Sequence, residues 1–234
     1  MMRANKPLGH PAYGSIGHLP NSRLGPGDHC VPEGQAKICI EKLRDRHDRI
    51  WVTEKLDGAC ASVAMIDGKI LALGRAGYLA QTSPFEHLQL FAEWVRWNEL
   101  RFKWLKEGYR IVGEWLALAH GTVYELDDEP IAFFDMFTPE NRRVSWERAS
   151  IVLGDHGFMT PALYSTNTIN PSFLRTLHPR GDLKAADGIE GFVYRVERHG
   201  KFDFMAKWVR PEKIDGCYLP DVSGKEEVWN WRPK

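Results

Sequence analysis

Residues 50–73 read IWVTEKLDGACASVAMIDGKILAL, and they set the expected pattern of secondary structure. The segment from Ile50 to Lys55 is predicted to be a strand. Two further apolar segments, 59–66 and 69–73, flank the pair Asp67-Gly68, which supplies the positive φ values that a tight hairpin turn needs. The stretch therefore predicts one strand followed by a β-hairpin.

The rest of the chain continues this pattern with few helices. Ser83, Pro84 and Glu86 form a capping-box pattern, and apolar residues then recur at helical spacing until Gly108, so the clearest helix is expected to start at Ser83. Further elements are expected as strands at 110–118, 131–137, 189–196 and 202–209 and a short helix at 145–153. Strands joined mostly as hairpins predict an α+β fold with largely antiparallel sheets flanked by a few helices.

The length of 234 residues lies between one and two typical domains. The opening of the chain is rich in Gly, Pro and His, which predicts irregular backbone rather than an early helix. No internal repeat or low-complexity stretch appears in the sequence. The expected organisation is a single domain over residues 1–234, with an irregular leader at 1–49 packed on it.

Composition and charge exclude several classes of protein. Lys plus Arg and Asp plus Glu each total 31, so bulk positive charge is not available to hold a polyanion. No apolar run approaches the roughly 18 residues of a membrane span, and no secretory signal opens the chain. The four cysteines form no CxxC pair, which is typical of reduced thiols in a cytoplasmic protein. The motifs GxxxxGK[ST], GxGxxG, HExxH and GxSxG are all missing from the sequence.

Five short strings stand out in their order along the chain: EKLDGA from Glu54, GEWLA from Gly113, FFDMF from Phe133, EGFVYR from Glu190 and AKWVR from Ala206. Together they resemble the motifs of the covalent nucleotidyltransferases, which comprise ATP-dependent DNA and RNA ligases and mRNA-capping guanylyltransferases. The likeness is closest to the RNA ligases, the group of the phage nick-sealing and trypanosome RNA-editing enzymes. The stretch GHLPNSRLGPGD from Gly17 also resembles a leader of bacterial and phage RNA-ligase-domain proteins.

The resemblance covers roughly residues 18–210, and it implies the fold of a nucleotidyltransferase domain, the adenylation domain of ATP-grasp-like ligases. It also implies a bacterial or phage-encoded intracellular protein. By this resemblance, the chain is expected to be an ATP-dependent RNA ligase.

The Lys-x-Asp-Gly motif occurs twice, at Lys55 and at Lys213. One such match is expected by chance in roughly one chain in twenty of this length. Lys55 precedes all the other motifs, whereas too little chain follows Lys213 to hold them. We therefore interpret Lys55 as the functional copy and Lys213 as a chance match or a surface lysine. A lysine amine attacks phosphorus only when neutral, a state that partial burial and neighbouring cations favour. Gly58 is expected to let the backbone approach a phosphate closely.

The resemblance implies a role for each motif residue. Lys55 is the nucleophile, Glu54 lies in the nucleotide site, and Arg75 contacts phosphate or ribose. Glu114 accepts hydrogen bonds from the ribose hydroxyls, and Phe134 stacks on the base. The last two roles fall to Glu190, which positions Mg²⁺ or Mn²⁺, and Lys207, which neutralises charge on the α-phosphate. Further candidate phosphate contacts are Arg23 and Arg210.

The residues themselves leave simpler interpretations open for three of these positions. Arg75 also fits a surface arginine at a strand end, Phe134 a core residue and Glu190 a surface glutamate. Many relatives carry two lysines separated by one residue where this chain has only Lys207, between Met205 and Val209. This departure affects the expected contacts with the α-phosphate.

The chain after Lys207 is too short for the OB domain that DNA ligases and capping enzymes usually carry there. We expect either the catalytic domain or a protein partner to grip the substrate instead. Basic and aromatic residues alternate in the helix from Ser83, which suits single-stranded nucleic acid but equally suits an amphipathic helix with aromatics packed inward.

The expected function is ATP-dependent RNA ligation. Lys55 would form a covalent lysyl-AMP, pass AMP to a 5′-phosphate end and allow a 3′-hydroxyl to seal the strand. The expected cofactors are ATP as AMP donor and Mg²⁺ or Mn²⁺, and the expected partners are RNA ends, with DNA ends as a second choice and no membrane. The alternatives are a DNA ligase, a capping-type transferase, or a nucleotide- or RNA-binding module without catalysis.

Overall fold

The computed structural model describes residues 6–126 and 129–233. The predicted domain and leader both include residues outside these ranges, namely 1–5, 127–128 and 234. The described chain forms two compact units. The first contains residues 6–14, 58–118 and 129–160, and the second contains residues 15–57, 119–126 and 161–233. One boundary between the units falls between Asp57 and Gly58, inside the first Lys-x-Asp-Gly motif.

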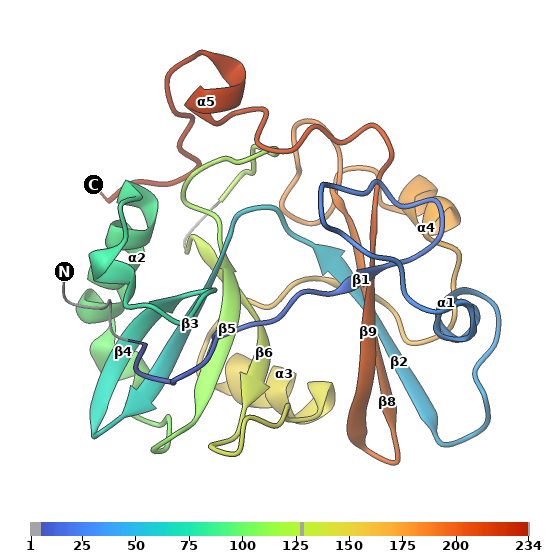
Figure 1. The fold of residues 1–234 in the computed structure, drawn as a ribbon, viewed down its shortest axis with the longest axis horizontal. Helices are drawn as coiled ribbons and strands as arrows, with labels where there is room; N and C mark the ends of the chain where they lie inside the picture. Colours follow the sequence, from blue (N-terminus) through green and yellow to red (C-terminus); the bar gives the residue numbers. More distant parts are fainter. Residues whose placement is uncertain (1–5, 127–128, 234) are drawn as a thin grey trace. The chain divides into compact units, whose positions relative to one another are not determined.

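The first unit is built on a four-stranded antiparallel sheet in the order β4-β3-β5-β6 (Figure 1). Its strands are β3 (Ala59–Ile66), β4 (Lys69–Gly74), β5 (Arg110–Trp115) and β6 (Ile131–Phe137). Asp67 and Gly68 connect β3 to β4 with φ values of 52° and 69°. The hairpin predicted from the Asp-Gly pair is therefore confirmed.

The helical elements of this unit are η1 (Ala80–Thr82), α2 (Glu86–Trp97), η2 (Glu99–Phe102) and α3 (Trp146–Asp155). The predicted capping box at Ser83 is wrong, because α2 begins at Glu86 and the Ser83 hydroxyl accepts a hydrogen bond from the Phe85 N–H at 3.2 Å. The helix also ends early. The Asn98 side-chain amide donates to the Trp94 carbonyl at 2.9 Å, and the chain then continues as the 3₁₀ turn η2.

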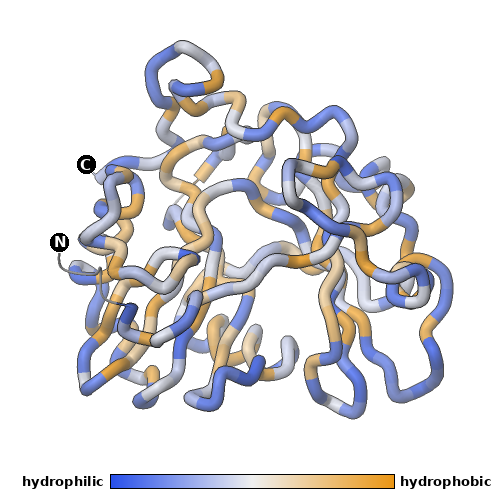
Figure 2. The backbone as a smooth tube through the Cα atoms, viewed as in Figure 1, coloured by the Kyte–Doolittle hydropathy of each residue, from blue (hydrophilic) through white to orange (hydrophobic). Residues whose placement is uncertain are grey.

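Aromatic side chains fill the core of the first unit. The Phe91 ring lies 5.3 Å from Trp115, and the Phe158 ring lies 5.1 Å from both Phe102 and Phe133. All five side chains are buried, and Figure 2 shows much of the sheet in the hydrophobic colour. In the segment after Ser83, Phe91, Trp94 and Phe102 are buried as the amphipathic interpretation expects, whereas Trp97 is 51% exposed.

The second unit is built on a five-stranded sheet in the order β1-β9-β8-β2-β7. Its strands are β1 (Gly17–His18), β2 (Asp48–Lys55), β7 (Leu163–Ser165), β8 (Gly191–Arg198) and β9 (Lys201–Val209). Only the β1–β9 pair is parallel among the described strands of this sheet. His199 and Gly200, with φ of 50° and 70°, turn β8 into β9, so the second predicted hairpin is confirmed with boundaries shifted by one or two residues.

The helices of the second unit are α1 (Glu33–Ile40), α4 (Pro171–Leu177) and the short α5 (Pro220–Ser223). Residues of α1 and α4 share a hydrophobic cluster with β2, β8 and β9, so these two helices cover one face of the sheet. Both β1 and α1 lie in the stretch that the sequence predicts to be an irregular leader. The α+β fold with mostly antiparallel sheets is confirmed. Within the described chain, no helix is both long and apolar enough to span a membrane.

Candidate functional site

Strand pairing in the second unit brings together two motifs that are distant in sequence. Lys55 is the last residue of β2, and its Cα pairs with Gly191, the first residue of β8. This register places Lys55 beside Glu190. The Lys55 Nζ donates to Glu190 Oε2 at 2.8 Å, with the two side chains 22% and 7% exposed. The lysine and the carboxylate therefore form a nearly buried pair at the end of the sheet.

Burial shapes the electrostatics of this pair. It raises the pKa of Glu190 because a carboxylate loses solvation there, and the positive charge of Lys55 opposes the shift only in part. Glu190 is thus buried and ion-paired, and the interpretation as a surface glutamate does not hold.

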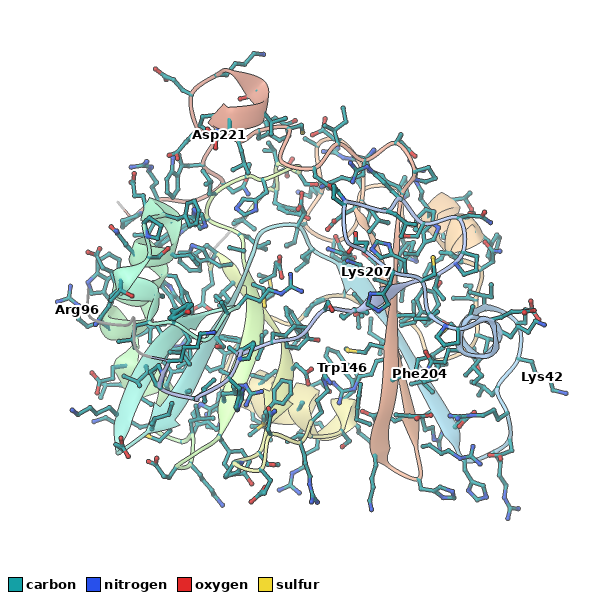
Figure 3. All side chains as sticks on the ribbon, viewed as in Figure 1. Lys42, Arg96, Trp146, Phe204, Lys207 and Asp221 are labelled. Carbon is teal, nitrogen blue, oxygen red and sulfur yellow. The ribbon has the colours of Figure 1, made fainter. Side chains whose placement is uncertain are left out.

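Lys207 lies on β9, on the face opposite to the hydrophobic cluster that contains Phe204 (Figure 3). Burial lowers the pKa of Lys207, and the nearby charge of Lys55 lowers it further. Lys207 therefore shares one electrostatic environment with Lys55 and Glu190. Met205 and Val209 are its neighbours on the same face of the strand.

The leader contributes two polar residues that the sequence analysis did not assign to the site. His18 pairs with Lys207 across the parallel strands β1 and β9. Its Nε2 lies 3.0 Å from Asp28 Oδ2, and Asp28 Oδ1 lies 3.5 Å from the Lys207 Nζ. The Nδ1 of His18 is hydrogen-bonded to Ser22 Oγ at 2.7 Å. The leader therefore packs a carboxylate against Lys207. Both His18 and Asp28 lie in the stretch from Gly17 that resembles the RNA-ligase leader, but the sequence of that stretch does not show that they contact Lys207.

The two candidate phosphate-binding arginines occupy different environments. Arg23 is ion-paired with Asp215. Arg210 is buried, its backbone N–H donates to the Glu190 carbonyl at 2.9 Å, and its Nη1 lies 3.8 Å from Glu212. The Nε of Arg210 is buried without a hydrogen-bond partner within the described residues. Arg210 thus lies next to Glu190, whereas Arg23 is engaged by a carboxylate.

The structure differs from the expected exposure of Lys213. The interpretation as a surface lysine is wrong, because its side chain is 1% exposed and forms an ion pair with Asp57. Asp57 belongs to the first Lys-x-Asp-Gly motif, so the two copies of the motif touch each other. The sequence could not show this, since the two residues are 156 positions apart.

Glu54, next to the nucleophile candidate, is also buried. Its Oε2 accepts hydrogen bonds from the Tyr164 hydroxyl at 2.7 Å and from the Asp182 N–H at 3.1 Å. Burial raises the pKa of Glu54, and these hydrogen bonds oppose that shift. Its Oε1 is buried without a partner within the described residues. One oxygen of the Glu54 carboxylate is therefore held by hydrogen bonds, whereas the other has no hydrogen-bond partner within the described residues.

Three expected site residues lie in the first unit. The Glu114 carboxylate accepts a hydrogen bond from the Gly58 N–H at 3.1 Å, which compensates a charged group on an otherwise apolar strand. Phe134 is half-buried with its ring 5.2 Å from Tyr13, while Phe133 is the fully buried member of the pair. Arg75 is exposed, and its Nη2 donates to the Gly14 carbonyl at 3.2 Å. Phe134 is thus not the phenylalanine that fills the core.

Gly58 is required by a close contact within the protein. A Cβ on Gly58 would overlap the carbonyl oxygen of Trp115 in β5. The approach of two backbone segments is thus a packing reason for this glycine, and its expected approach to a phosphate stays a prediction.

Gly58→Ala is expected to lower the unfolding free energy by about 1–3 kcal/mol, the usual cost of forcing an extra methyl into a packed site. Gly74→Ala is the matched control, because its Cβ would meet only Leu88 Cδ1 at 3.7 Å. Thermal or denaturant unfolding of both variants measures the difference. Equal stability of the two variants would contradict the packing explanation.

In the comparison with protein-family models, residues 48–209 match the RNA ligase model. This range is more than half of the chain and contains the whole sequence from β2 to β9. The chain belongs to the RNA ligase family. A comparison with curated proteins finds no match.

Solved structures of an RNA ligase from Naegleria gruberi share the fold of this RNA ligase family member. A Naegleria gruberi RNA ligase variant with ATP and Mn is 18% identical, with a TM-score of 0.52, over 92% of this chain and 64% of that one. An apo variant of the same ligase is 13% identical, with a TM-score of 0.53, over 90% of this chain and 58% of that one. An archaeal ATP-dependent RNA ligase is 17% identical, with a TM-score of 0.48, over 84% and 48%. The chain therefore spans about half the length of the archaeal ligase.

Proposed function

We propose that this RNA ligase family member joins RNA ends with ATP through a lysyl-AMP intermediate on Lys55. The observation that carries the proposal is the 2.8 Å hydrogen bond between Lys55 and Glu190. It unites, at one end of a sheet, the two motifs that the resemblance assigns to nucleophile and metal site. The match of residues 48–209 to the RNA ligase model supports the same assignment.

In the proposed first step, the Lys55 nitrogen attacks the α-phosphorus of ATP. A nitrogen–phosphorus bond forms as the bond from the α-phosphorus to pyrophosphate breaks. AMP then passes to the oxygen of a 5′-phosphate end, which frees Lys55. Finally the 3′-hydroxyl of the other end attacks that phosphate and releases AMP, leaving a phosphodiester. Fixed positions of the reacting groups lower each barrier.

We propose that the cationic residues near Lys55 bind the α-phosphate of ATP. Lys207 shares the electrostatic environment of Lys55, and a positive charge there stabilises charge that builds as pyrophosphate leaves. Arg210 is the better supported of the two arginines, because its Nε is a buried donor and its main chain is hydrogen-bonded to that of Glu190. Arg23 would have to exchange its ion pair with Asp215 for a phosphate.

We propose that the remaining motif residues bind the nucleoside part of ATP. Glu114 would accept the ribose hydroxyls and Phe134 would stack on the base, since its ring is not part of the core. Arg75 would contact phosphate or ribose from its exposed position. Glu54 would complete the nucleotide site with its buried Oε1, which has no hydrogen-bond partner in the described part of the chain.

The residues also fit a divalent cation of the Mg²⁺ type. Within the described residues, no group of three or more His, Cys, Asp or Glu side chains could hold a metal by itself. Mg²⁺ usually needs only one or two carboxylates, because it keeps several waters and binds phosphates of the substrate. Glu190 is the carboxylate that would hold it, and the cation would supply charge neutralisation at the phosphates.

Chelation of divalent cations is expected to abolish lysyl-AMP formation, and added Mg²⁺ or Mn²⁺ should restore it. The measurement is covalent labelling with α-labelled ATP before and after EDTA treatment. Labelling that persists at the same rate in excess EDTA would contradict the role of Glu190 as metal ligand.

A strand-joining assay tests the proposed substrate. We expect RNA strands with a 5′-phosphate and a 3′-hydroxyl, held on a complementary strand, to be joined in the presence of ATP. RNA with a 5′-hydroxyl is the matched control and should remain unjoined. Faster joining of the equivalent DNA ends would assign the enzyme to DNA instead, and ATP binding without joining or labelling would support a binding module.

A further inference from the structure

The second Lys-x-Asp-Gly copy has a structural connection to the first. The Lys213 Nζ pairs with Asp57 Oδ2 and donates to Thr122 Oγ1 at 3.0 Å. The lysine side chain is 1% exposed and that of Asp57 is 15% exposed. Asp57 lies two residues after Lys55. A lysine outside the motif set of the proposed reaction therefore holds a residue inside it.

Asp57 is fixed from several directions. Its Oδ2 also accepts the Gly121 N–H at 2.8 Å, and its own N–H donates to the Tyr124 hydroxyl at 2.8 Å. Burial alone would raise the pKa of Asp57, but the charge of Lys213 outweighs it together with that of Lys55, so the pKa is lowered. The turn after the nucleophile is thus held through both its main chain and its side chain.

The path of the Lys213 side chain is equally restricted. A Cβ on Gly121 would lie 2.7 Å from both the Lys213 Nζ and the Ile214 carbonyl oxygen and 2.8 Å from the Lys213 Cε, so the lysine and its neighbour's main chain both pass directly over this glycine. The Lys213 N–H donates to the Arg210 carbonyl at 3.1 Å, and the Arg210 N–H donates to the Glu190 carbonyl at 2.9 Å. The segment after β9 therefore connects Asp57 on one side to Glu190 on the other.

We propose that Lys213 is a positioning residue for the reaction of Lys55. By holding Asp57, it fixes the turn that follows Lys55 and so keeps the amine in line for attack beside Glu190. This inference rests on the proposed function. Lys213 is not a second nucleophile, because its buried Nζ is held by Asp57 and Thr122.

Three variants test the positioning role. Lys213→Met removes the charge from the pair, and Gly121→Ala crowds both the Lys213 side chain and the Ile214 carbonyl without changing either charged residue. Lys37→Met is the matched control, since Lys37 is paired with Glu33 on the surface and is 54% exposed. We expect both Lys213→Met and Gly121→Ala to slow lysyl-AMP formation at saturating ATP by about 10- to 100-fold, as small misplacements of reacting groups do. The ATP concentration for half-maximal rate should change much less.

A double variant separates positioning from general loss of structure. If Lys213 acts through Asp57, then Lys213→Met combined with Asp57→Asn should be no slower than Asp57→Asn alone. Amide hydrogen exchange at Gly121 should also accelerate in Lys213→Met and remain unchanged in Lys37→Met.

Each outcome of these experiments decides the proposal. If the wild-type chain takes up label and the Lys213→Met chain is labelled at the same rate, the positioning role is wrong. The proposed function is not affected by that result. Fully additive losses in the double variant overturn the positioning role as well. A wild-type chain that takes up no label overturns the proposed function, and the positioning role with it.

Discussion

Lys55→Arg is expected to eliminate covalent labelling of the chain by α-labelled ATP. The guanidinium keeps a positive charge beside Glu190, so the buried carboxylate retains a cationic partner. The guanidinium is not a nucleophile toward phosphorus, however. Removal of a covalent nucleophile typically costs on the order of 10⁴-fold or more in rate. The measurement is label retained on the denatured chain after incubation with ATP and Mg²⁺.

Lys201→Met is the control for this prediction, because Lys201 is an exposed lysine on β9 of the same unit. It should be labelled at the wild-type rate. Unfolding curves of Lys55→Arg should resemble those of the wild type, which excludes misfolding as the reason for lost label. Undiminished labelling of Lys55→Arg would show that the reactive residue lies elsewhere.

Glu190→Gln is expected to slow lysyl-AMP formation by about 10²–10³-fold, the usual effect of removing one preorganised electrostatic group. Glutamine has nearly the same shape, and the backbone carbonyl at this position still accepts the Arg210 N–H. The substitution therefore removes the negative charge that faces Lys55 and that would bind the metal, with little change in packing. Single-turnover labelling at saturating ATP and several Mg²⁺ concentrations measures the effect.

Glu125→Gln provides the matched control. Glu125 is 60% exposed and is paired with Lys184, so loss of its charge should leave the labelling rate unchanged. If the role of Glu190 is to bind metal, higher Mg²⁺ should restore part of the lost rate in Glu190→Gln. A wild-type rate in this variant would mean that the 2.8 Å pair with Lys55 is only structural.

Much of the fold could be predicted because its signals are local. The strand β6 matches the predicted 131–137 in full, since a continuous apolar run marks a buried strand. Both predicted hairpins form, because Asp67-Gly68 and Gly200 supply the required turn conformations. The start of α2 was missed because the Ser83 hydroxyl binds Phe85 in a local turn instead of capping the helix.

The candidate site could be predicted only as far as its motifs. The resemblance assigns Lys55 and Glu190 to one site, and the strand register brings their side chains together. The burial of Lys213 and the contact of Asp28 with Lys207 could not be read from the sequence, since both depend on how distant segments pack. The sequence around a charged residue does not show which distant residue forms an ion pair with it.

The most direct test is to locate the covalent AMP. Wild-type protein is incubated with α-labelled ATP and Mg²⁺, denatured and digested, and the labelled peptide is sequenced by mass spectrometry. The proposed function predicts one labelled peptide, with AMP on Lys55, and no label from GTP. No label from either nucleotide, or label on a lysine other than Lys55, would contradict it.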